Sequence, residues 1–78
     1  MTIEQSVRRF LAERFPGYDD AIATDTPLDG IVDSLGLFDL VSFLETEYSL
    51  KFPPAEFSPE LFRSIGEVVS VVRRYGQP

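Results

Sequence analysis

The residue best suited to chemistry is Ser34, in the run Asp33-Ser34-Leu35-Gly36, where a polar loop meets a helical pattern. Serine near a helix start is most often a simple cap, but Asp33 is at least as good an N-cap. Ser34 can then occupy the first helical position, with its hydroxyl exposed at the positive end of the helix dipole. Unpaired backbone N–H groups there would stabilise an attached phosphate. The pattern therefore predicts a phosphate-linked modification of Ser34, and phosphorylation by a kinase satisfies the same physics.

Catalysis by the chain itself is not expected, because it contains no histidine and no cysteine. The usual general base near neutral pH and the thiol nucleophile are both missing. Lys51, the only lysine, follows the helix that Ser34 opens and is a poor candidate for a Ser-Lys pair. The sequence thus predicts a protein that is not an enzyme.

A calcium site is also not expected. Asp25, Asp29 and Gly30 fall on positions 1, 5 and 6 of an EF-hand loop. Pro27 and Gly36, however, stand at positions 3 and 12, where the ion needs oxygen ligands. We interpret the carboxylates of this loop as solvated side chains and expect no metal site.

The composition is that of one folded soluble domain spanning residues 1–78, with 44% hydrophobic and 26% charged residues. A net charge of −6 argues against nucleic-acid binding and favours partners with basic surfaces. No apolar run is long enough to span a membrane, and no signal-peptide pattern occurs. We expect a discrete, monomeric, cytoplasmic protein rather than a module cut from a larger one.

Helical spacing of the apolar residues predicts an all-α fold, a small four-helix bundle with three longer helices and a short third one. The first helix is expected over about residues 3–15, after a capping box of Thr2 and Gln5, with Arg8 turned outward. A long loop follows. We expect a few buried side chains to pin it, and the candidates are Ile22, Leu28 and Ile31.

The second helix starts after Asp33 and ends before the break at Pro53-Pro54. Residues 58–62 are expected to form the short helix, and residues 64–76 the last one. The buried face of the second helix is predicted to consist of Leu37, Leu40, Val41, Leu44 and Tyr48.

A second stripe on this helix lies outside the buried face and combines apolar with acidic side chains. It is expected to be a docking surface, unless Leu35 and Phe38 pack under the long loop instead. The stripe, called the docking face below, consists of Leu35, Phe38, Asp39, Ser42 and Glu45.

The Asp33-Ser34-Leu35-Gly36 motif, the order of helices and the proline break together resemble the acyl carrier protein family over the whole chain. The resemblance implies that Ser34 carries 4′-phosphopantetheine, added from coenzyme A by a phosphopantetheinyl transferase, with Asp33 and Leu35 as its recognition context. An acyl group would be held as a thioester on this arm. Loading ligases and acyl-processing enzymes with basic patches would then bind the docking face.

Gly36 and Leu37 stand where fatty-acid carriers typically have an acid after the motif, which argues against a general fatty-acid role. The Pro53-Pro54 break followed by Glu56-Phe57 is similar to stand-alone carriers of specialised pathways. Gly36 is also expected to fray the first helical turn slightly. One alternative is an aminoacyl or peptidyl carrier of the D-alanyl type, and another is a non-carrier helical interaction module phosphorylated on Ser34. Phe10, Phe15 and Tyr48 are expected to fill the core, which predicts weak sequestration of the cargo.

Overall fold

The computed structural model describes residues 2–51 and 58–76. These residues form three α-helices and one short 3-10 helix, in the order α1 (Ile3–Arg14), α2 (Ser34–Tyr48), η2 (Pro59–Phe62) and α3 (Ile65–Tyr75). The predicted all-α class is therefore correct. The proline break expected at positions 53–54 lies outside the described residues.

The short third helix expected over residues 58–62 is a 3-10 helix of one turn, so the described residues hold three α-helices and a 3-10 helix, and a bundle of four helices is not confirmed. Its bonds join residues three apart, from Leu61 N to Ser58 O at 3.0 Å and from Arg63 N to Glu60 O at 3.4 Å. Ser64 follows at once and caps α3 by accepting a hydrogen bond from the backbone of Glu67 at 3.2 Å. The segment between the two caps is too short for the i→i−4 ladder of an α-helix.

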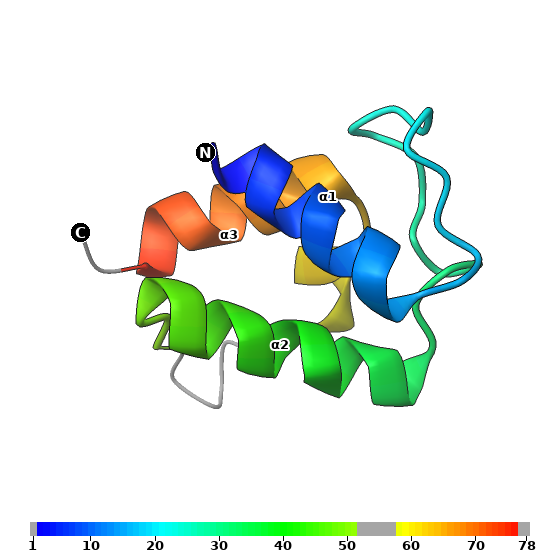
Figure 1. Ribbon diagram of the computed structural model, residues 1–78. Coiled ribbons are helices and arrows are strands. Elements are labelled where there is room, and N and C mark those ends of the chain that lie inside the picture. The colour runs from blue at the N-terminus through cyan, green and yellow to red at the C-terminus, as the bar shows by residue number, and fades with distance from the viewer. Residues whose placement is uncertain (1, 52–57, 77–78) are drawn as a thin grey trace.

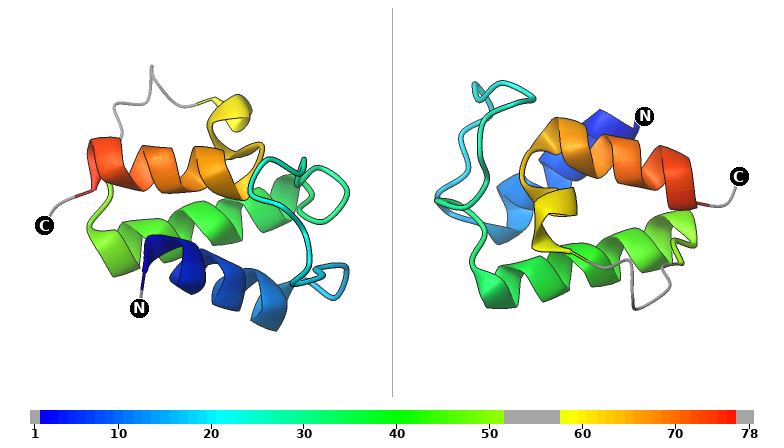
Figure 2. Two further views of the ribbon diagram at one scale, coloured as in Figure 1. Left: turned by 90° about the horizontal axis from the view of Figure 1, so that it is seen from above. Right: turned by 180° about the vertical axis from the view of Figure 1, so that it is seen from behind.

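The three α-helices enclose one core, with α1 and α3 side by side and α2 running beneath them (Figures 1 and 2). The predicted inner face of α2 is confirmed, because Leu40 and Leu44 are fully buried and the other three positions pack against the core. Each fully buried aliphatic side chain contributes roughly 1.5–3 kcal/mol. The completely enclosed residues of the core include Val7, Leu11, Leu40, Leu44, Ile65 and Val68.

The long loop between α1 and α2 is fixed to the start of α3 by two backbone hydrogen bonds. Leu28 N donates to Arg63 O at 2.7 Å, and Gly66 N donates to Thr24 O at 2.8 Å. The Leu28 side chain is buried to 1% exposure, while Ile22 and Ile31 are partly buried against the core. Pinning of the loop by these three residues is thus confirmed.

The prediction that the side chain of Arg8 is turned outward was wrong. Its side chain is only 18% exposed and is paired with Glu4, from Nε to Oε2, at 2.9 Å. The guanidinium also donates to the Tyr18 hydroxyl at 3.2 Å and to the backbone oxygens of Asp20 and Ile22 at 3.1 and 2.9 Å. The loop folds back over the outer side of α1, so a position that the helical pattern assigns to solvent becomes the loop's main attachment point.

Candidate functional site

Ser34 is the first residue of α2, as predicted, and it is exposed. Asp33 has extended backbone geometry and caps the helix, since its carboxylate accepts a hydrogen bond from Gly36 N at 2.7 Å. The N–H groups of Ser34 and Leu35 belong to the first turn, where helices have no intrahelical acceptors. A negative group on the Ser34 hydroxyl would therefore lie at the positive end of the helix, next to backbone donors.

The segment before Ser34 is held by the buried Leu28. Leu28 O accepts hydrogen bonds from Ile31 N at 2.9 Å and from Val32 N at 2.7 Å, which makes a tight turn directly before the helix cap. Because the same residue donates its N–H to Arg63 O, this turn is joined both to the core and to the end of η2. The hydroxyl of Ser34 is consequently presented from a fixed backbone.

Gly36 allows an aromatic side chain to pack closely against α2. The sequence predicted only that this glycine frays the first helical turn. A Cβ added at this buried position would lie 2.9 Å from Phe15 Cζ and 3.2 Å from Asp33 Oδ1, and nearer still to Phe15 Cε1. Phe15 in turn meets the Phe10 ring edge-on, with ring centroids 6.0 Å apart. The absent side chain at Gly36 lets an aromatic ring rest against the first turn of α2.

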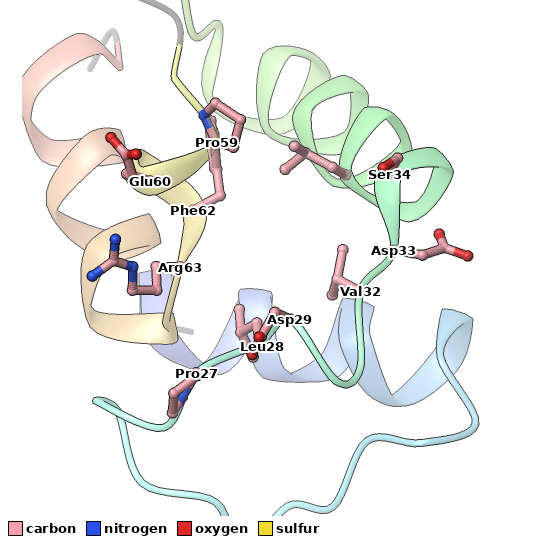
Figure 3. A pocket seen from close by; sticks show the side chains of 11 residues that line it. Pro27, Leu28, Asp29, Val32, Asp33, Ser34, Pro59, Glu60, Phe62 and Arg63 are labelled. Carbon is pink, nitrogen blue, oxygen red and sulfur yellow. The ribbon is translucent and has the colours of Figure 1, made fainter.

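A cavity of about 520 Å³ opens beside Ser34 and is shown in Figure 3. Leu37 of α2 lines it. Val32, just before α2, lies on one side, and Pro59 and Phe62 of η2 lie on the other. Its other lining residues are Pro27, Leu28, Asp29, Asp33, Ser34, Glu60 and Arg63. Sequence reasoning missed this cavity because its walls come from three separate segments that no local spacing connects.

The docking face is exposed, which excludes the alternative that its apolar members pack under the loop. Leu35 is 78% exposed and Phe38 is 68% exposed, and its other three members are exposed as well. Asp39 Oδ2 forms an ion pair with Arg14 Nη1 of α1 at 3.5 Å. The Arg14 guanidinium also lies 5.4 Å from the centre of the Phe10 ring. Arg14 is on another helix, so spacing along α2 does not reveal this cation next to the docking face.

The interior that a sequestered cargo would have to enter is occupied by packed side chains. Phe10 is 5% exposed and stacks on Phe43, with ring centroids 4.4 Å apart. Leu40, Leu44 and Val68 are fully buried. None of these residues lines the cavity next to Ser34, although Leu28 and Phe62 of its lining belong to the same core.

Two structural features are absent from residues 2–51 and 58–76. None of their helices combines the length and apolar character needed to cross a membrane. Within the same residues, no group of three or more acidic side chains is placed to hold a metal ion.

Comparison with known proteins found no matching family model. A protein of Serratia sp. (strain ATCC 39006), described as the probable acyl carrier protein PigG, is 33% identical to the chain over 75 residues. The aligned region covers 92% of this chain and 86% of that protein.

Proposed function

Because the chain belongs to the acyl carrier protein family, we propose that it holds an acyl group as a thioester on a 4′-phosphopantetheine arm attached to Ser34. It would present this group to partner enzymes of a biosynthetic pathway. Acyl carrier proteins are carriers and not enzymes, in agreement with the missing histidine and cysteine. The observation that carries the assignment to Ser34 is its exposed hydroxyl at the first position of α2, beside a separate capping residue.

The residues around Ser34 fit such an arm in charge and in shape. The first turn of α2 offers backbone N–H donors and the positive end of a helix dipole to a phosphodiester. The neighbouring cavity has apolar walls with Asp29, Glu60 and Arg63 among its polar lining, a mixture suited to a chain that alternates amide and alkyl groups. The arm would supply the thiol that this chain lacks.

The chain's own contribution would be positioning. Asp33 and the Leu28 turn hold the hydroxyl of Ser34 on a fixed backbone, so the attached arm pivots from a defined point. A tethered thioester meets each docked active site at an effective concentration far above that of a free thioester in solution. Loading ligases and acyl-processing enzymes would be the partners that use this tether.

Intact-mass spectrometry tests the attachment site directly. After incubation with coenzyme A and a broad-specificity phosphopantetheinyl transferase, the protein should gain the mass of one phosphopantetheine. Ser34→Ala should gain nothing, whereas Ser70→Ala, which removes an exposed serine of α3, should react fully. No gain in the wild type, or a gain that persists in Ser34→Ala, would refute the proposal. A smaller gain equal to one phosphate in cells would instead support the phosphorylated interaction module.

Weak sequestration of the cargo belongs to the same proposal, because Leu40, Leu44 and Val68 are fully enclosed. Amide NMR shifts of the holo protein and of a long-chain acyl form should differ mainly around the cavity beside Ser34. Large shifts at those three core residues would contradict this expectation. Loading assays with adenylating enzymes for carboxylic acids and for amino acids would separate an acyl from an aminoacyl carrier.

A further inference from the structure

The two apolar members of the docking face lie directly beside the proposed attachment point. Leu35 follows Ser34 in the chain, and Phe38 lies about one helical turn further along α2. Both side chains are mostly exposed, at 78% and 68%. An enzyme that receives a group from Ser34 must therefore approach within reach of these two side chains.

Asp39, which follows Phe38 in the chain, is paired with a cation of the same molecule. Asp39 forms its ion pair with Arg14 at the C-terminal end of α1, and Arg14 is also held over the Phe10 ring. An exposed pair of this kind adds little stability. It does, however, place a positive charge at the edge of the docking face, where it offsets the field of Asp39 and would repel a basic patch on a partner.

Two further acids, Glu45 of the docking face and Asp33 before it, act more weakly at Phe38 than Asp39 does. The carboxylate of Asp33 accepts a hydrogen bond from Gly36 N at the positive end of α2. Glu45 lies seven positions beyond Phe38, about 10 Å along the helix axis, whereas charges are screened over about 8 Å at physiological ionic strength. The surface around Phe38 is consequently apolar with its nearest acid paired, whereas the cavity on the other side of Ser34 carries Asp29, Asp33, Glu60 and Arg63 and the chain as a whole is strongly acidic.

We propose that partner enzymes recognise this carrier through an apolar recess that receives Phe38 and Leu35, with no cluster of cations opposite Asp39. The inference rests on the proposed function and replaces the basic patches expected from sequence. Burial of an exposed aromatic side chain at the centre of an interface supplies the attraction, and the Arg14–Asp39 pair remains intact at its rim.

The test uses the full-length apo protein, coenzyme A and a broad-specificity phosphopantetheinyl transferase as the probe partner. The kcat/KM for modification is measured at about 20 and about 300 mM sodium chloride, a range over which screening of exposed charges becomes much stronger. Asp39→Asn and Arg14→Gln are compared with Glu13→Gln and Arg9→Gln, which alter a second exposed ion pair, 3.7 Å long, on α1. Phe38→Ala and Leu35→Ala probe the apolar pair, and circular dichroism checks that each variant is folded.

We expect the wild-type kcat/KM to change by about twofold or less between the two salt concentrations. The four charge variants should also stay within about twofold of the wild type, while Phe38→Ala should lose about tenfold or more, mainly through KM. A tenfold fall with salt, a tenfold loss in Asp39→Asn but not in Glu13→Gln, or wild-type kinetics in folded Phe38→Ala would each overturn the inference. Absence of any mass gain on Ser34 would instead refute the proposed function, so the two failures are distinguishable.

Discussion

Replacing Arg8 with alanine is expected to lower the free energy of unfolding by about 2–4 kcal/mol. The substitution removes hydrogen bonds to the Tyr18 hydroxyl and to the backbone oxygens of Asp20 and Ile22, at 2.9–3.2 Å, together with the ion pair to Glu4. A net hydrogen bond to a charged group contributes about 1.5–3 kcal/mol, but these four share one side chain and are not additive. For a domain of this size the total stability is about 4–12 kcal/mol, so the loss is large.

Urea unfolding followed by circular dichroism measures the effect, and Arg9→Ala is the matched control. Arg9 is the adjacent arginine of the same helix, but its side chain is 67% exposed and its ion pair with Glu13 is 3.7 Å long. Its loss should cost about 0.5 kcal/mol or less. Arg8→Lys keeps the charge without the forked geometry and should recover less than half of the loss. If Arg8→Ala and Arg9→Ala unfold at the same urea concentration, the loop is not held by this side chain and the reasoning fails.

Three more outcomes are expected from single positions. Gly36→Ala should destabilise the protein by about 1 kcal/mol in urea unfolding, because crowding against the Phe15 ring outweighs the gain in helix propensity, and the loss should vanish in a Phe15→Leu background. Ser49→Gly should increase the free energy of unfolding by about 0.5–1 kcal/mol and so raise the melting temperature, because Ser49 ends α2 with a left-handed φ of 52° that glycine adopts more readily. A lower melting temperature would contradict this. Burial, reinforced by the hydrogen bond to Asp20, raises the pKa of Tyr18 above 10.0. The folded protein keeps this proton at a pH where the unfolded chain has lost it, so the contribution of Tyr18 to the free energy of unfolding should be full below about pH 10 and fall as the pH rises beyond it. The fall should be smaller in Tyr18→Phe.

The features that could be predicted from sequence are those fixed within a few neighbouring residues. The capping box of Thr2 and Gln5 and the Asp33 cap each depend on bonds that span three positions, and the structure contains both. The placement of Ser34 followed from the second of these. The short third helix was also predicted from a local signal, a serine cap followed by proline, and the closeness of the next cap at Ser64 goes with a 3-10 turn there rather than an α-helix.

Features that depend on chain reversal could not be predicted in the same way. The position of Arg8 on α1 indicates a solvent-facing side chain, and the return of residues 18–22 over the helix adds three partners to the local one, Glu4. Arg14 and Asp39 are likewise on different helices, so the charge balance of the docking face is a tertiary property. Spacing along α2 identified the members of that face but could not reveal which cation lies next to it.

The cavity beside Ser34 shows how the pinned loop and the attachment site are linked. Leu28 and Arg63 both line the cavity, where the loop meets the end of η2, and the hydrogen bond from Leu28 N to Arg63 O joins the loop wall to the η2 wall. Leu28 is 1% exposed, so widening the cavity would withdraw a buried side chain and break this bond, at a cost of about 2–4 kcal/mol. In the proposed carrier, this linkage would hold the loop wall and the η2 wall together beside the arm. A cargo too bulky for the cavity would then stay outside, where partner enzymes could reach it.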